Sequence, residues 1–168
     1  MGHNALLTNT ESYNTAIGYA AMQSNTTGNY NVAVGSGAGY VNSTGTHNTY
    51  LGRDAGASNT TGLRNTIVGA QAGDNGIFND NTFVGYGAGT TAGNDAGGNT
   101  CVGASAGFNI STGVNNLLLG YNAGTSNAPG GTVNNENNFV VLGNNDTSSL
   151  YCADTSISSS DSRDKTDI

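Results

Sequence analysis

Apolar and polar positions follow one short phrase that recurs along the chain. Asn is followed by a residue that is most often Thr, then by two apolar residues and a Gly, as in Asn14-Thr-Ala-Ile-Gly18 and Asn65-Thr-Ile-Val-Gly69. The phrase begins at Asn14, Asn31, Asn48, Asn65, Asn81, Asn99 and Asn116, at intervals of 16 to 18 residues. A fixed period this short is typical of stacked units that are each too small to bury their own apolar face.

Each repeat holds one short strand and then a run of Gly, Ala, Asn, Ser and Thr that is typical of turns. Strand, turn and turn make one coil of a solenoid. The pattern therefore predicts an all-β fold, a parallel β-solenoid or β-roll-like stack of about seven 17-residue repeats. An aliphatic residue stands directly before the Gly in every repeat. A disordered polar chain would not keep such a pattern, so we expect an ordered fold.

The repeated Asn residues have a structural interpretation. In a stack of parallel strands, identical side chains lie above one another, so an Asn column can form a ladder of amide hydrogen bonds along the rod. We expect Asn14, Asn31, Asn48, Asn65, Asn81, Asn99 and Asn116 to form this ladder rather than a ligand site.

Two consecutive apolar positions in each strand point to opposite faces. We expect the uniform column that includes Ile17, Val34 and Leu51 to fill the coil interior. The variable column that includes Tyr50 and Phe83 would then face outward as an apolar stripe that something must cover. Other copies of the chain are the economical cover, so we expect a parallel homo-oligomer, an intertwined or side-by-side homotrimer.

The repeat defines the expected organisation of the chain. Residues 1–13 are expected to be an N-terminal cap or degraded repeat, in which Asn4-Ala-Leu-Leu-Thr8 is similar to a degraded strand phrase. Residues 14–143 form the repeat region, which ends with a last phrase at Asn138-Phe-Val-Val-Leu-Gly143. Residues 144–160 are expected to form an exit segment and tail, and residues 161–168 are expected to be the start of a further, truncated domain, whose resemblance is described below.

Composition limits the partners. The chain has 4 Lys and Arg against 11 Asp and Glu, which gives a net charge of -7. Nucleic acid and anionic membranes both need clustered cations, so neither is an expected partner, and no apolar run is long enough for membrane insertion. Two cysteines and two histidines at scattered positions predict no metal site, and no cofactor is expected. Cys101 occupies an apolar repeat position and is expected to be a small buried hydrophobe.

The tail Ser160-Asp-Ser-Arg-Asp-Lys-Thr-Asp-Ile168 resembles the opening of the intramolecular chaperone domain that ends endosialidase-type phage tailspikes and tail fibres. The resemblance implies three chains assembled by the chaperone, and self-cleavage between Ser160 and Asp161. It matches Ser160 to the serine nucleophile and Lys165 to the assisting lysine. We expect self-cleavage only in a parent that carries the whole chaperone, because Lys165 must be buried to act as a base.

The repeats are also similar to the head repeats of trimeric bacterial adhesins, although those are usually shorter. Both resemblances imply a host-contact organ. We expect a structural and adhesive segment of a phage tail fibre near its distal tip, located in the virion and extracellular, that binds a host cell-surface glycan or protein. An adhesin head remains an alternative.

Receptor contacts are expected from exposed loops and from the residue just after each strand Gly, where the candidates are Tyr19, Arg53, Tyr86 and Tyr121. The residues indicate no enzyme. A tailspike depolymerase is an alternative, but it commonly needs paired carboxylates, whereas the carboxylates here are expected in separate loops without a repeated partner. They are Asp54, Asp74, Asp80 and Asp95.

Two other solenoid functions are less well supported. An ice-binding face would need unbroken Thr columns, and the Thr column is interrupted by Val32 and Leu117. A calcium-binding roll would need a Gly-Gly-x-Gly-x-Asp repeat, which is absent from the sequence.

Overall fold

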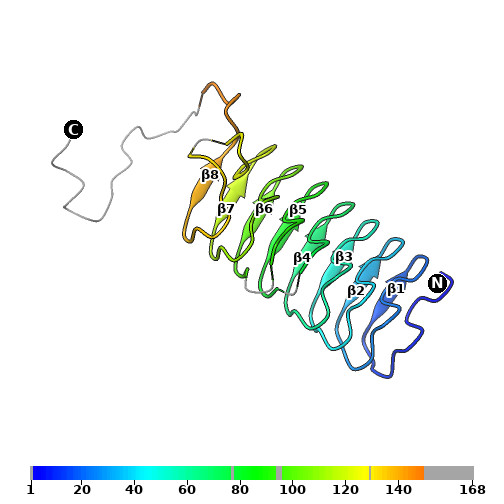
Figure 1. The fold of residues 1–168 in the computed structure, drawn as a ribbon. Helices are drawn as coiled ribbons and strands as arrows, with labels where there is room; N and C mark the ends of the chain where they lie inside the picture. The colour runs from blue at the N-terminus through cyan, green and yellow to red at the C-terminus, as the bar shows by residue number, and fades with distance from the viewer. Residues whose placement is uncertain (1, 77, 94–95, 129, 150–168) are drawn as a thin grey trace.

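The chain folds as a solenoid with one short strand in each coil (Figure 1). The structure, a computed structural model, describes residues 2–76, 78–93, 96–128 and 130–149. Eight parallel strands form one sheet in sequence order. They are β1 (Thr15–Ile17), β2 (Val32–Val34), β3 (Thr49–Leu51), β4 (Thr66–Val68), β5 (Thr82–Val84), β6 (Thr100–Val102), β7 (Leu117–Leu119) and β8 (Val140–Leu142).

The register is constant along the stack. Thr15 pairs with Val32, Val32 pairs with Thr49, and each later strand continues the same alignment up to Val140 in β8. Equivalent positions of the repeat therefore lie directly above one another, about 4.8 Å apart. The predicted β-solenoid is confirmed, and the phrase at Asn138 supplies its last strand.

The assignment of the two apolar columns to the two faces of the sheet was wrong. The central residue of every strand is buried, including Tyr50, Ile67 and Phe83, which are fully enclosed. The uniform aliphatic column faces outward, so Ile17 keeps 52% and Leu51 keeps 45% of its surface exposed. In each three-residue strand the first and third side chains point outward, so only the middle side chain can be buried. The middle residue is the variable apolar position of the repeat.

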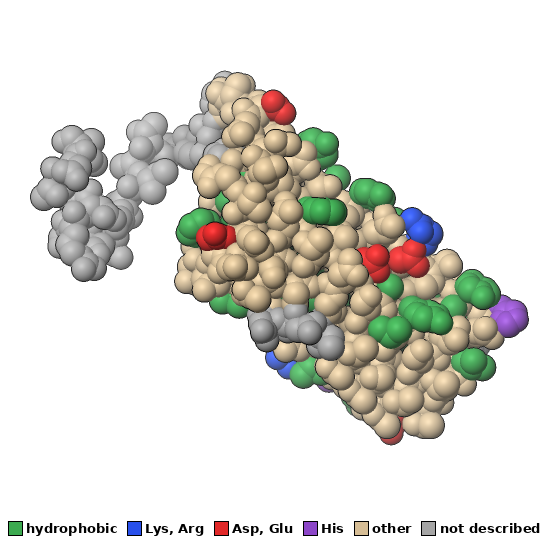
Figure 2. All heavy atoms as spheres, viewed as in Figure 1, with side chains coloured by type: hydrophobic (Ala, Val, Ile, Leu, Met, Phe, Trp, Pro, Cys, Tyr) green, Lys and Arg blue, Asp and Glu red, His purple; other side chains and the backbone are tan. Residues whose placement is uncertain are grey.

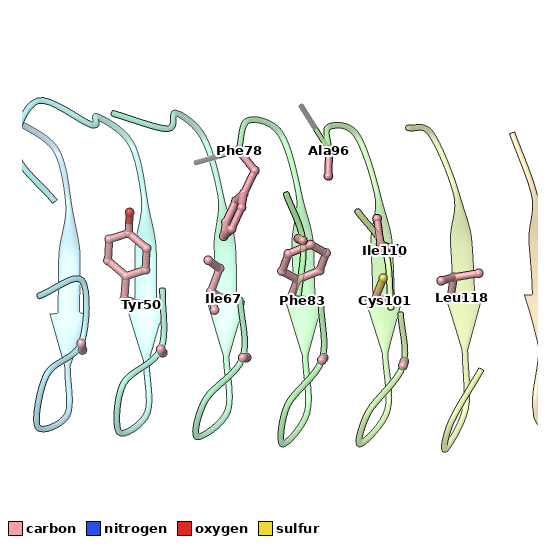
Figure 3. Close-up of a cluster of buried hydrophobic side chains, with 14 of the residues drawn as sticks. Tyr50, Ile67, Phe78, Phe83, Ala96, Cys101, Ile110 and Leu118 are labelled. Atoms are coloured by element: carbon pink, nitrogen blue, oxygen red, sulfur yellow. The ribbon is translucent and has the colours of Figure 1, made fainter. Parts of the chain in front are cut away.

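The core lies between the strands and the turns that face them. Figure 3 shows Tyr50, Ile67, Phe83, Cys101 and Leu118, from β3 to β7, placed one above another in the coil interior. Turn residues complete the packing, and the Phe78 ring contacts Phe83 edge-on with centroids 5.5 Å apart. Strand and turn side chains thus form one close-packed core.

The predicted Asn ladder is present and buried from Asn31 onward. Each Asn side chain links two coils, because its Oδ1 accepts a hydrogen bond from the backbone N–H of the next Asn. For Asn31 and Asn48 this N–O distance is 2.9 Å. Its Nδ2 donates to a turn carbonyl, as Asn31 does to Gly45 at 2.7 Å. The amide therefore satisfies backbone groups that the short strands leave unpaired.

A second buried amide column was not predicted. Asn25, Asn42 and Asn59 are fully buried, and Nδ2 of Asn42 donates to Oδ1 of Asn25 at 2.8 Å. The hydroxyl of Tyr50 lies between Asn42 and Asn59, where it donates to Oδ1 of Asn42 at 3.3 Å and accepts from Nδ2 of Asn59 at 2.7 Å. Further along the stack, Phe78 and Ile110 provide buried apolar side chains in the turns instead.

The N-terminal segment continues the stack without a strand. Residues 3–8 form turns, and the backbone N–H groups of Leu6 and Thr8 donate to the carbonyls of Ala21 and Gln23. Asn4-Ala-Leu-Leu-Thr8 therefore lies against the first turn of the repeat region rather than against β1, so its similarity to a strand phrase was misleading.

Candidate receptor-binding face

A glycine ends each of the first seven strands and places the following side chain on the surface. Gly35 has a φ of 139°, and a Cβ at this position would lie only 2.3 Å from the carbonyl oxygen of Gly52 in the next coil. Only glycine allows this turn and this spacing. The residue after the glycine is then exposed, as for Tyr19, Tyr86 and Tyr121 at 60%, 60% and 63%.

The predicted receptor residues share this column but not one site. Tyr19 follows β1, Arg53 follows β3, Tyr86 follows β5 and Tyr121 follows β7. Tyr19 lines a groove that also includes Asp54, the neighbour of Arg53. Tyr86 lies in another part of the column, where its hydroxyl contacts Oε1 of Gln71 at 2.8 Å.

The groove beside Tyr19 has a volume of about 290 Å³ and crosses three coils. Tyr19 and Tyr40 supply the aromatic surface, and Ala20, Gly37 and Ala57 supply small residues between them. Ser36 and Asp54 add a hydroxyl and a carboxylate. Neither Tyr40 nor Asp54 was predicted to belong to a site with Tyr19, because the three residues occupy different positions of the repeat.

Charge is concentrated at one end of this groove. Nη1 of Arg53 lies 2.7 Å from Oδ2 of Asp54. Asp74, in the next coil, is partly buried, and this burial together with the Asp54 carboxylate raises its pKa, while Arg53 partly offsets the shift. The groove thus ends in an Arg53–Asp54 ion pair with a second carboxyl group, of raised pKa, in the next coil.

Two of the four carboxylates singled out above form ion pairs with arginines in the described part of the chain. Asp54 is paired with Arg53 and acts on Asp74. Asp80 forms two hydrogen bonds with Arg64, at 2.6 and 2.9 Å, which lower the pKa of Asp80. Asp95 lies outside the described residues.

A second groove, of about 320 Å³, occupies the same turn position further along the solenoid. It is lined by amide and hydroxyl side chains such as Ser105, Asn122 and Asn127, with the half-exposed ring of Phe108 among them. The two grooves therefore differ in chemistry. The first combines tyrosines with a carboxylate, and the second is lined mainly by neutral hydrogen-bonding groups.

An aromatic ladder lies before the strands, at the position that precedes each ladder Asn. The rings of Tyr13 and Tyr30 stack with centroids 4.9 Å apart and an interplanar angle of 1°, and His47 stacks on Tyr30 at 5.0 Å. Arg64 and Asp80 continue the same column as an ion pair. The recurrence of a ring immediately before Asn14, Asn31 and Asn48 was the sequence signal for this stack.

On the face shown in Figure 2, charged side chains are few and scattered among uncharged groups. In the part of the chain that the structure describes, no group of three or more His, Cys, Asp or Glu residues could hold a metal ion. The same residues contain no helix of the length and apolarity that a membrane span requires. Ser160 and Lys165, matched above to the self-cleavage residues, lie outside the described residues.

Comparison of the chain with protein-family models, with curated proteins and with solved structures found no match. The functional conclusion below therefore depends on the geometry of the solenoid and on its surface chemistry.

Proposed function

We propose that this chain is a structural and adhesive segment of a phage tail fibre, assembled as a parallel homotrimer. The observation that carries the proposal is the outer face of the sheet. There, one aliphatic column continues through all eight strands from Ile17 to Leu142, and no charged side chain lies in any strand. Exposing such a continuous apolar column to water is energetically unfavourable, so we expect other copies of the chain to cover it.

The constant register of the strands supports parallel assembly. Each coil presents the same short outer face, so copies that run in the same direction around a common axis bring equivalent aliphatic residues together. The outer Thr residues of β1, β3 and β4 border that column and supply hydroxyl groups that can pair with polar groups of a neighbour. A fibre segment of this kind is expected in the virion, outside the host cell.

Adhesion would use the turns rather than the sheet. The two grooves and the exposed tyrosines of the post-strand column combine aromatic rings with hydrogen-bonding groups, which suits a host cell-surface glycan or protein. The tail that resembles a chaperone opening supports maturation by chaperone-assisted trimerisation, with cleavage after Ser160 wherever a whole chaperone domain is present.

The test is binding of the purified chain to a panel of bacterial envelope polysaccharides, with the release of reducing ends measured in parallel. The proposal predicts saturable retention of at least one polysaccharide, with no increase in reducing ends. Retention of none of them, by a chain shown to be folded by circular dichroism, would contradict the adhesive role.

One observation favours a second candidate, a depolymerase that cuts host glycans. Burial and the neighbouring Asp54 carboxylate raise the pKa of Asp74. A carboxyl group of raised pKa beside a second carboxylate is the pair of groups that glycoside hydrolysis commonly uses. A release of reducing ends that Asp74→Asn abolishes would establish this second candidate in place of the first.

A further inference from the structure

We propose that the groove formed by Tyr19, Tyr40 and Asp54 binds one pyranose ring of a neutral saccharide. This inference rests on the proposed adhesive function and assigns that function to a particular site and ligand class. It depends on three features of the groove, namely its shape, its aromatic surface and its charge.

The shape results from small residues at three neighbouring coils. Ala20, Gly37 and Ala57 line the groove between the larger side chains, and a Cβ at Gly37 would lie 2.4 Å from Oδ1 of Asp54. The carboxylate therefore lies directly against the Gly37 backbone. The volume of about 290 Å³ is near the lower end of the range for ligand pockets, roughly 300 Å³, which suits a single sugar ring rather than a larger ligand.

The aromatic surface comes from two tyrosines with different surroundings. Tyr19 is 60% exposed, and His3 lies beside it with ring centroids 5.9 Å apart. Tyr40 is 39% exposed and belongs to the next coil. Tyrosine presents an apolar ring and a polar hydroxyl, so it can pack against the C–H face of a sugar while bonding a hydroxyl at its edge.

The charges select against acidic ligands. Arg53 holds Oδ2 of Asp54, so its guanidinium is already paired, while Oδ1 is the oxygen that lies against Gly37. A carboxylate oxygen accepts hydrogen bonds from sugar hydroxyls, and it repels an acidic sugar. The net charge of -7 also disfavours the approach of an acidic sugar. A neutral hexose fits these constraints better than a sialic acid does.

The test uses saturation-transfer NMR on the 168-residue chain with the methyl glycosides of glucose, galactose, mannose and N-acetylglucosamine, and with the methyl glycoside of N-acetylneuraminic acid as the acidic comparison. We expect transfer to at least one neutral glycoside and none to the acidic one. Tyr19→Ala and Tyr40→Ala should each weaken binding by about fivefold, the effect of losing one aromatic contact. Tyr13→Ala is the matched control, because Tyr13 is an exposed tyrosine that lies outside both the groove and the post-strand column.

The outcomes distinguish a failure of the groove assignment from a failure of the proposed adhesive function. Transfer to no neutral glycoside, or transfer unchanged in the Tyr19→Ala, Tyr40→Ala double variant, would overturn the inference. If the double variant still retains envelope polysaccharide, adhesion stands and takes place elsewhere on the chain. If the glycosides bind in the groove but no polysaccharide is retained, the groove assignment stands and the adhesive function fails.

Discussion

Oδ1 of Asn48 accepts a hydrogen bond of 2.9 Å from the backbone N–H of Asn65, one coil further along the solenoid. Asn65 repeats the arrangement, because its own Oδ1 accepts from the N–H of Asn81 at 3.0 Å. Its Nδ2 donates to the carbonyl of Phe78 at 2.7 Å. Each ladder Asn thus connects two neighbouring coils and one turn, all in buried surroundings.

Substituting Asn65 by Ala should destabilise the fold strongly. The change leaves the N–H of Asn81 and the carbonyl of Phe78 buried without their partners, and each such group costs about 1 to 3 kcal/mol. We expect a loss of about 2 to 4 kcal/mol in the free energy of unfolding, measured by urea denaturation. Asn75→Ala is the matched control, since Asn75 is exposed. Equal stability of the two variants would contradict a structural role for the ladder.

Gly56 is expected to tolerate no side chain, because it lies against the ring of Tyr50. A Cβ at Gly56 would lie 2.3 Å from the ring, and its φ of 59° is in the left-handed region. Gly56→Ala should cost about 3 kcal/mol, from strain and overpacking together. At Gly131, φ is 87° and nothing lies within 4 Å of the added Cβ, so Gly131→Ala should cost only the strain, about 1 kcal/mol. A thermal melt of both variants tests this difference.

Asp74 and Asp80 should give opposite effects of pH on stability. Burial raises the pKa of Asp74, so the stability that its neutral form provides is present below the ordinary value near 3.8 and is lost as the pH rises through the raised pKa. Asp74→Asn should therefore be more stable than the parent at neutral pH and lose this advantage in acid.

The hydrogen bonds from Arg64 lower the pKa of Asp80, which reverses the sign. Its contribution is present above the ordinary value near 3.8 and is lost as the pH falls through the lowered pKa. Asp80→Asn should therefore be slightly less stable than the parent at neutral pH and equal to it in strong acid. Urea denaturation over a series of pH values measures both variants, and the same sign for the two would contradict the assigned environments.

Cys101 should not react with thiol reagents in the folded protein. Its side chain is fully buried, and burial raises the pKa of the thiol to about 12. The thiolate is the reactive form, so modification requires opening of the coil. In a Cys152→Ser protein, we expect a disulfide-exchange reagent to label Cys101 only after denaturant is added. Rapid labelling of the folded protein would show that the interior of the solenoid opens readily.

The sequence was sufficient to predict the strands, because Asn and Gly mark both ends of each one. It was not sufficient to assign the faces. Uniform Val and Ile residues resemble a repetitive core, but the buried column can vary, since turn residues such as Met22 and Phe78 adjust the packing coil by coil. Each residue of the outer aliphatic column packs mainly against the equivalent residues of the two adjacent strands. Similar side chains at this position pack well on one another, so the outer column remains uniform.

The groove could not be predicted from the repeat alone. Tyr19, Tyr40 and Asp54 occupy different positions in three successive coils, and only the stacking register brings them to one groove. The post-strand column nevertheless predicted exposed tyrosines correctly, because a glycine in this conformation directs the next side chain to the surface.

The oligomeric mass in solution tests the central claim most directly, together with the variant Leu51→Asp on the outer sheet face. One chain has a mass of 16.8 kDa, and three copies give 50.4 kDa. By light scattering on a sizing column, the trimer proposal predicts 50.4 kDa for the parent and a folded species of lower mass for Leu51→Asp, since a buried charge without a partner disrupts an apolar interface. A folded parent of 16.8 kDa would contradict it and would mean that the column from Ile17 to Leu142 is stable in water.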